Sequence, residues 1–135
     1  MVGFPGENEE EFEESFAFVE KVKFAKAHIF AYSRRPGTRA YDAPNQVSNA
    51  MKELRSHKMI ELTQKDKREF FKSQLGFVEE VLWEREISPN CYEGYTKNYT
   101  PVHTVCNENI SGKILQTKLV EQQEDWCTGI ILQQN

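Results

Sequence analysis

The 135-residue sequence lacks several features that would define its class at once. It has only three cysteines, Cys91, Cys106 and Cys127, and these are too widely spaced and odd in number to form a disulfide framework. No apolar run reaches the length that spans a bilayer, and the first residues lack the basic-then-apolar pattern of a signal peptide. We therefore expect a reducing, cytoplasmic location and no membrane partner.

The sequence also lacks the residue patterns of a self-contained active site. No P-loop, Ser-His-Asp arrangement or pair of carboxylates stands out, so we assign no catalytic residue. His103 and Cys106 form a His-x-x-Cys pair that Cys91 and Cys127 could complete as a zinc site. Buried, inert cysteines are the simpler interpretation, so we assign no metal ligand.

Charge is unevenly distributed, although the net charge is only −4. Residues 7–20 carry seven acidic and no basic side chains, whereas residues 21–58 carry nine basic side chains against two acidic ones. From residue 72 onward, acidic side chains again outnumber basic ones by nine to five. A polyanionic partner is therefore expected to meet the middle of the chain.

Apolar spacing predicts two helices in the first half. Asn8 is a good N-cap for the first, and Glu11 lies three residues later, as in a capping box. Apolar side chains then recur at helical spacing, at Phe12, Phe16, Val19 and Val22. The second helix is predicted from Ser48 to about Ser73, with a possible bend or break between Leu54 and Met59, where the apolar spacing slips.

Residues 27–33 are apolar and aromatic, which predicts a strand, with His28 expected in the core. The glycine- and proline-rich residues 1–7 are typical of a turn that leaves an earlier strand. Strand, helix and strand at this spacing require a parallel sheet, and one such unit cannot cover both of its faces. Residues 1–73 are therefore expected to be part of a larger α/β domain.

From residue 76 the pattern changes to short alternating segments separated by turn residues. It predicts five antiparallel strands, near residues 77–87, 92–97, 99–105, 110–120 and 126–132. Five short strands favour a small closed barrel, which leaves no exposed edge. The predicted fold class is thus an α/β partial barrel in residues 1–73, followed by an all-β, five-stranded, OB-like barrel in residues 74–135.

Two groups of residues could contact a polyanion. Arg34, Arg35 and Arg39 flank a Pro-Gly turn, and guanidinium groups suit phosphate; solvated arginines or ion pairs with the acidic helix remain equally open. The barrel carries aromatic residues beside polar ones, an arrangement that stacks unpaired bases unless half of the rings are core. These residues are Tyr92, Tyr95, Lys97, Asn98, Tyr99 and His103. The acidic balance of this half favours a modest, assisted RNA contact.

Taken in order, these motifs resemble a known family. The acidic helix and the segments around it are similar to the C-terminal part of the radical S-adenosylmethionine methylthiotransferases. The segments are Gly3-Phe-Pro-Gly-Glu7, Phe30-Ala-Tyr-Ser-Arg-Arg-Pro-Gly-Thr38 and Ser73-Gln-Leu-Gly76. Gly94-Tyr-Thr-Lys-Asn-Tyr99 resembles the TRAM domain that ends these enzymes and helps to hold tRNA. The double arginine is most similar to the branch that acts on threonylcarbamoyl-adenosine at position 37 of tRNA.

The resemblance implies the end of a radical SAM, TIM-like barrel followed by a TRAM domain, and 2-methylthiolation of N6-threonylcarbamoyladenosine 37 as the function. The family uses S-adenosylmethionine and two 4Fe-4S clusters, which are held by cysteine motifs that this sequence does not contain. We therefore expect the missing N-terminal part of the same enzyme as a partner. Alone, the chain is expected to bind no cofactor stably and to have no activity.

The same resemblance assigns roles to individual residues. The residues expected to border the adenine of the cofactor, mostly through their backbone, are Gly3, Gly6, Glu7, Phe30 and Tyr32. Those expected to face the substrate or the tRNA anticodon loop are Ser33, Arg34, Arg35, Arg39, Tyr95, Lys97, Asn98 and Tyr99. Two other functions remain open: a stand-alone RNA-binding module built on the OB-like barrel, and a non-catalytic interaction fragment.

Overall fold

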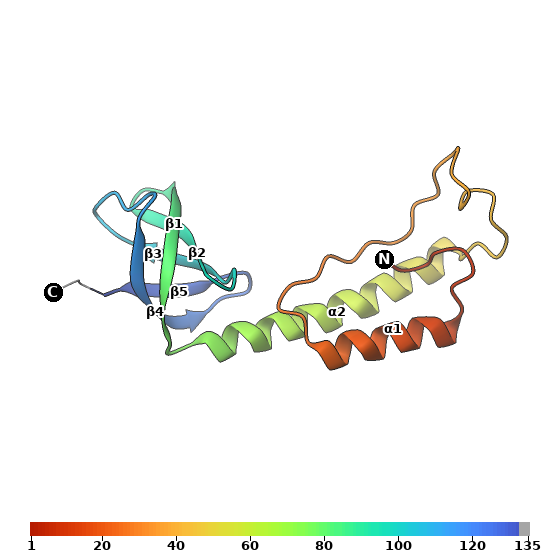
Figure 1. The fold of residues 1–135 in the computed structure, drawn as a ribbon, viewed down its shortest axis with the longest axis horizontal. Coiled ribbons are helices and arrows are strands. Elements are labelled where there is room, and N and C mark those ends of the chain that lie inside the picture. Colours follow the sequence, from red (N-terminus) through yellow and green to blue (C-terminus); the bar gives the residue numbers. More distant parts are fainter. Residues whose placement is uncertain (133–135) are drawn as a thin grey trace. The chain divides into compact units, whose positions relative to one another are not determined.

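A computed structural model describes residues 1–132, and Figure 1 shows the order of its elements. The helices are α1 (Glu9–Val22) and α2 (Asn49–Gln74), and the strands are β1 (Val78–Ser88), β2 (Cys91–Thr96), β3 (Pro101–Val105), β4 (Ile114–Gln122) and β5 (Cys127–Ile131). The chain divides into two compact units, Met1–Lys67 and Arg68–Asn135. None of the helices in the described residues is both long enough and apolar enough to cross a bilayer.

Helix α1 begins as the sequence predicts. The side chain of Asn8 accepts a hydrogen bond from the Glu11 N–H at 2.9 Å, and the Glu11 carboxylate accepts one from the Asn8 N–H at 2.9 Å. This reciprocal pair is a capping box, which satisfies two main-chain donors at the start of the helix. On its inner face Phe12 is completely buried against Val2 and Met59.

The strand predicted over residues 27–33 is reduced to a single parallel bridge. Val2 donates from its N–H to the Phe30 carbonyl at 2.8 Å, and Tyr32 donates from its N–H to the Val2 carbonyl at 2.8 Å, so that Val2 pairs with Ala31. The prediction is therefore wrong in extent, although the pairing is parallel. Two paired segments without a third strand are only marginally stable as a sheet, and within residues 1–132 no third segment pairs with these two.

Helix α2 also begins where the sequence predicts. The Ser48 hydroxyl accepts a hydrogen bond from the Met51 N–H at 3.2 Å. The helix runs without a break through residues 54–59. Where the apolar spacing slips, polar side chains, Lys52 and Arg55, occupy part of the buried face.

The five strands form a closed barrel in the order β1-β2-β3-β5-β4. Four of them lie within two residues of their predicted ranges, whereas β4, predicted from residue 110, begins only at Ile114 because residues 110–113 form a turn. The prediction that all pairs are antiparallel is wrong for β3 and β5, which pair in parallel through Val102–Cys127 and His103–Thr128. Parallel neighbours need a crossover between them, and here β4 is that crossover. This order is consistent with an OB-like, TRAM-like Greek-key barrel.

The barrel core extends onto the end of α2. Trp83, Val102 and Leu119 are completely buried inside the barrel, and Phe71 of α2 is buried in the same cluster, with Phe70 packed against it. This packing explains why residues 68–74 group with the barrel. The assignment of the two units to a radical SAM domain and a TRAM domain stays a prediction.

Candidate functional site

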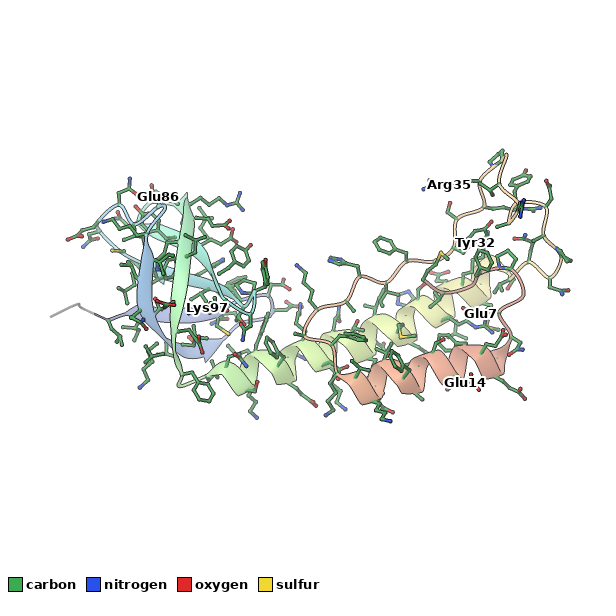
Figure 2. All side chains as sticks on the ribbon, in the orientation of Figure 1. Glu7, Glu14, Tyr32, Arg35, Glu86 and Lys97 are labelled. Carbon is green, nitrogen blue, oxygen red and sulfur yellow. The ribbon has the colours of Figure 1, made fainter. Side chains whose placement is uncertain are left out.

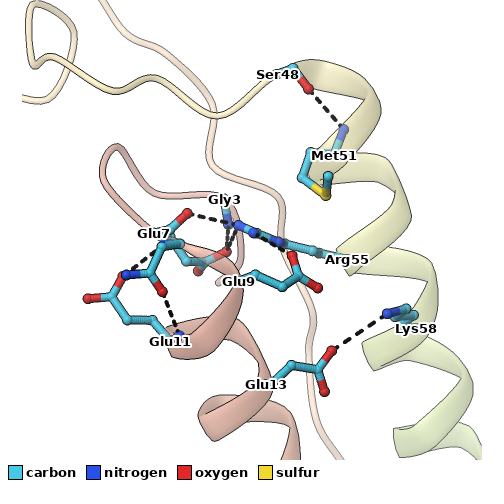
Figure 3. Close-up of polar contacts among 10 residues, drawn as sticks. Gly3, Glu7, Glu9, Glu11, Glu13, Ser48, Met51, Arg55 and Lys58 are labelled. Atoms are coloured by element: carbon cyan, nitrogen blue, oxygen red, sulfur yellow. Dashed lines mark hydrogen bonds and ion pairs between the residues drawn. The ribbon is translucent and has the colours of Figure 1, made fainter.

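Glu7, which was expected to border a cofactor, lies within a polar network between the N-terminal turn and α2 (Figure 3). Its Oε1 accepts hydrogen bonds from the Gly3 N–H at 2.9 Å and from Arg55 Nη1 at 2.7 Å. Arg55 Nη1 also donates to the main-chain oxygen of Glu7 at 3.0 Å, and Nη2 pairs with Glu9 at 3.0 Å. The Arg55 side chain is only 5% exposed. The Glu7 carboxylate therefore fixes the turn onto the helix.

Gly3 and Gly6 serve this turn in different ways. Both have positive φ, +74° and +91°, which favours glycine. A Cβ on Gly3 would lie 2.4 Å from Cγ of Lys52, so Gly3 lets α2 approach the turn closely. A Cβ on Gly6 would meet nothing within 4 Å, so the space beside its Cα is open, although its N–H already donates to the Asn45 carbonyl at 2.9 Å.

Phe30 and Tyr32 project differently from the bridge segment. The Phe30 ring is 65% exposed, whereas Tyr32 is buried with its ring edge-to-face with Phe4 at 5.3 Å. The bridge to Val2 already uses the Phe30 carbonyl and the Tyr32 N–H. His28 is exposed and stacks on Phe30 at 6.5 Å, so its predicted place in the core is wrong: the missing strand leaves nothing to cover it.

The three arginines lie on the extended loop before α2, where Figure 2 labels Arg35. Arg34 donates from Nε to the Tyr41 carbonyl at 2.7 Å, and its guanidinium lies 4.4 Å from the centre of the Tyr41 ring. Arg35, Arg39 and Ser33 are exposed. Within residues 1–132, none of the three arginines forms an ion pair with the acidic residues of α1. Their guanidinium groups therefore remain accessible to an anionic partner.

The barrel brings together three of its four predicted contact residues, Tyr95, Lys97 and Tyr99. They line a groove of about 550 Å³, together with Leu82, Ile114, Thr96, Glu80 and Glu84. Tyr99, at 83% exposed, offers most of its ring to solvent. The Lys97 ammonium is ion-paired with Glu80, and the hydrogen bond and charge of that carboxylate raise the pKa of the lysine.

Asn98, the fourth predicted contact, instead holds the turn between β2 and β3. Its Oδ1 accepts hydrogen bonds from the hydroxyls of Thr96 at 2.6 Å and Thr100 at 2.9 Å. Its Nδ2 donates to the Gln74 side chain at 2.8 Å. Asn98 thus positions Lys97 and Tyr99 through the turn that carries them.

A second cluster lies on the outer face of β1, β2 and β3. Arg85 Nη2 pairs with Glu93 at 3.0 Å, His103 Nε2 lies 3.3 Å from the other Glu93 oxygen, and the His103 ring stacks on Trp126 at 4.5 Å. Tyr95 lies close to this cluster: burial, and then the charges of Glu93 and Glu84, raise its pKa, while Arg85 lowers it. The cluster therefore adjoins the groove.

The curated relatives of this chain share one activity in their names, although no family model matches the chain. The chain is 34% identical over 133 residues to the tRNA-2-methylthio-N(6)-dimethylallyladenosine synthase of Caldicellulosiruptor saccharolyticus, covering 98% of the chain and 28% of the relative. It is 36% identical over 125 residues to the threonylcarbamoyladenosine tRNA methylthiotransferase MtaB of Bacillus subtilis, and the match covers 90% of the chain and 28% of that relative. The chain is a homologue of tRNA methylthiotransferases.

Homology to these methylthiotransferases does not select a branch. The dimethylallyladenosine synthase of Thermoanaerobacter sp. is 39% identical over 123 residues, a value close to that of the Bacillus subtilis MtaB. The chain spans only between about a quarter and a third of the length of such relatives. The activity, substrates and partners of these relatives are therefore only proposed for this chain.

The three cysteines of the chain all lie in the barrel unit. Cys91 and Cys106 are half-buried and Cys127 is buried, where burial raises the pKa of its thiol to about 11. Across the described residues, no three His, Cys, Asp or Glu side chains gather where they could hold a metal ion. The zinc interpretation of the His-x-x-Cys pair is thus not supported.

Sequence reasoning missed Trp126, Glu93 and Lys52. Trp126 lies in the β4–β5 turn, and only the closed barrel brings it onto His103. The alternation of β2 places Glu93 on the same face as Tyr95, a signal that could have found it. Lys52 lies on a helix whose apolar pattern slips, and that slip was the available sign of a buried polar residue.

Proposed function

We propose that this chain forms part of an enzyme that 2-methylthiolates N6-threonylcarbamoyladenosine at position 37 of tRNA. In this proposal residues 1–73 supply part of the cofactor and substrate wall, and the barrel is the TRAM domain that holds the anticodon loop. The observation that carries it is the homology with tRNA methylthiotransferases over 90–98% of the chain. A cytoplasmic location follows from the same proposal, because tRNA is modified there.

The arginine-bearing loop supports the threonylcarbamoyl branch. A threonylcarbamoyl group carries a carboxylate, whereas a dimethylallyl group is apolar. Arg35 and Arg39 are exposed beside Arg34, and guanidinium groups pair with carboxylates through two parallel hydrogen bonds. An apolar substituent would gain nothing from these three charges.

The cofactors of the family fit this chain unequally. The clusters require several cysteine thiolates, but residues 1–67 contain no cysteine and the three barrel cysteines form no group. The clusters therefore do not fit this chain, and we assign it no catalytic step; a missing N-terminal part of the same enzyme would supply those ligands. S-adenosylmethionine, the source of the radical in the family, would be bordered by the open space beside the Cα of Gly6 and by the exposed ring of Phe30.

The barrel supports a tRNA contact based on stacking. Tyr95 and Tyr99 line the groove, and aromatic rings stack on unpaired bases of any sequence. Lys97 is already neutralised by Glu80. The barrel is therefore proposed to assist binding, while the arginine loop supplies the main contact with phosphate or carboxylate.

The branch is tested by nucleoside analysis of tRNA from a strain that lacks the gene. We expect loss of the 2-methylthio group from threonylcarbamoyladenosine and unchanged 2-methylthio-dimethylallyladenosine. The reverse result would assign the chain to the sister branch, and no change in either nucleoside would remove the enzymatic proposal.

The tRNA contact is tested by binding of an anticodon stem-loop to the 135-residue chain at several salt concentrations. We expect the double change Lys97→Ala with Tyr99→Ala to weaken binding, because it removes both the ring and the charge from the groove. Lys118→Ala is the matched control, since Lys118 is exposed on β4 and does not line the groove. Equal losses in both variants would reject the groove as the contact.

A stand-alone RNA-binding module is the second candidate function. The barrel is a compact unit with its own buried core, which supports independent folding. Unchanged tRNA nucleosides in the deletion strain, with retained RNA binding, would favour this module. Absence of both properties would leave the non-catalytic interaction fragment.

A further inference from the structure

A groove of about 490 Å³ lies between residues 31–34 and the first turns of α2. Polar side chains from both segments line it, among them Tyr32, Arg34, Asn49, Lys52 and Ser56. Of these, only Tyr32 and Arg34 belong to the residues assigned above. The groove lies entirely within residues 1–67.

Lys52 is the first unusual feature of this groove, because it is a cation that is only 8% exposed. Its stem packs against the backbone of Gly3, and its ammonium lies 5.1 Å from the centre of the Tyr32 ring. Among residues 1–132, no carboxylate lies within ion-pairing distance of it. A buried ammonium is costly without a partner, and one aromatic ring compensates only part of that cost.

The second feature is a pair of hydroxyls without partners. The hydroxyl oxygens of Tyr32 and Ser56 are both buried, and neither forms a hydrogen bond. Buried polar atoms in folded proteins are nearly always hydrogen-bonded, so two orphans lining one groove indicate a missing acceptor. Both hydroxyls can donate a hydrogen bond, as can the ammonium of Lys52.

We propose that this groove binds an oxyanion, a phosphate or carboxylate group, through Lys52 with help from the hydroxyls of Tyr32 and Ser56. All three groups are donors, and an oxyanion offers several acceptors to them at once. The positive end of the α2 dipole adds to the attraction, because the groove lies along the first turns of that helix. The proposal deepens the proposed function. The existence of the site does not depend on that function, but the identity of the molecule that carries the oxyanion does.

Glu53 is the one carboxylate that lines the groove, and it opposes an anion. It is exposed and has no ion pair with Lys52, so its charge is screened by water. The two residues should therefore change the affinity for an oxyanion in opposite directions, which can be tested. Neutralising Glu53 should strengthen the binding of an oxyanion, whereas neutralising Lys52 should weaken it.

The test is a titration of the 135-residue chain by NMR at constant ionic strength. The probes are inorganic phosphate, N6-threonylcarbamoyladenosine, and adenosine as the control without an oxyanion. We expect Lys52→Met to weaken oxyanion binding about tenfold, as expected for the loss of one charge-assisted hydrogen bond. The methionine keeps the unbranched stem that packs on Gly3. We expect Tyr32→Phe to weaken binding severalfold and Glu53→Gln to strengthen it.

The outcomes separate the two sources of the oxyanion. Binding of phosphate alone points to the RNA backbone. Binding of the carboxylated nucleoside in preference to adenosine points to the modified base. Either result supports the site if Lys52→Met abolishes that binding. No binding of either probe, or equal binding by Lys52→Met and the unchanged chain, overturns it. If the chain binds phosphate but the tRNA nucleosides of the deletion strain are unchanged, the proposed function is rejected and the oxyanion site is still supported.

Discussion

Arg55 in α2 holds Glu7 by two hydrogen bonds from the same nitrogen, although 47 residues separate them in the sequence. Its Nη1 lies 2.7 Å from the Glu7 carboxylate and 3.0 Å from the Glu7 carbonyl. The guanidinium also lies 5.3 Å from the centre of the buried Phe12 ring. This contact fastens the N-terminal turn to α2, beside the core of the first unit.

We expect Arg55→Met to destabilise the first unit by about 3–5 kcal/mol, because it leaves the Glu7 carboxylate with no cation in a largely buried place. Hydrogen exchange of the α1 amides measures this effect. Lys58→Met is the control: it breaks the exposed pair with Glu13 at 3.6 Å and should change stability by less than about 1 kcal/mol. Similar losses of stability in both variants would show that the Arg55 contact contributes no more than an exposed ion pair.

A second prediction concerns the close approach of β1 and β2. A Cβ on Gly94 would lie 2.5 Å from the Leu82 carbonyl oxygen and 2.9 Å from the Trp83 ring. Gly94→Ala should therefore destabilise the barrel by about 1–3 kcal/mol, because backbone has to move.

Tryptophan fluorescence during denaturant unfolding checks this prediction, since both tryptophans, Trp83 and Trp126, belong to the barrel unit. Gly112→Asn is the control. Gly112 has φ +77° with nothing within 4 Å, and asparagine tolerates that conformation at a cost of less than about 1 kcal/mol. A barrel that is unaffected by Gly94→Ala would mean that the two strands can separate freely.

The parts of the fold that the sequence predicts are those decided within a few residues. Asn8 and Glu11 cap α1 because both partners lie in one turn. The strands of the barrel are found because the alternation of β2 places Tyr92, Gly94 and Thr96 inside and their neighbours outside.

The rest depends on contacts between distant segments, which no local pattern contains. The parallel pair of Val102 and Cys127 requires the barrel to close. The strand over residues 27–33 fails to form because a strand needs neighbours as well as apolar residues. In the same way, the stacking of Trp126 on His103 is set by a turn between other strands.

The ion pair of Lys97 with Glu80 leads to a third prediction. Glu80→Gln should strengthen binding of an anticodon stem-loop, because it frees the ammonium to contact a phosphate. The slope of log K against log salt should steepen by about 0.7, the value for one additional phosphate contact on a single strand. The comparison of two backgrounds is decisive: Lys97→Ala should cost more affinity in Glu80→Gln than in the unchanged chain. Equal costs would mean that the ion pair does not restrain Lys97.

The thiol of Cys127 gives a fourth prediction, on reactivity. Burial raises its pKa from 9.0 to about 11, so at pH 8 it is a neutral thiol in the barrel core. Because the thiolate is the reactive form, Cys127 should be alkylated by iodoacetamide far more slowly than the half-buried Cys91 and Cys106. Mass spectrometry of the labelled peptides measures the three rates. Rapid labelling of Cys127 in the folded chain would show that the barrel opens locally.

The same thiol makes barrel stability depend on pH, and the direction follows from the raised pKa. The folded barrel favours the protonated thiol, so this contribution to stability is complete below about pH 9 and is lost as the pH rises toward 11. The free energy of unfolding should therefore fall across that window, and Cys127→Ala should flatten part of the fall. The rest of the fall should persist, because the pKa values of Tyr92 and Tyr95 are also raised by burial and that of Lys97 is raised by Glu80. A fall of the same size in Cys127→Ala would mean that the alkaline sensitivity comes from Tyr92, Tyr95 and Lys97 and not from the thiol.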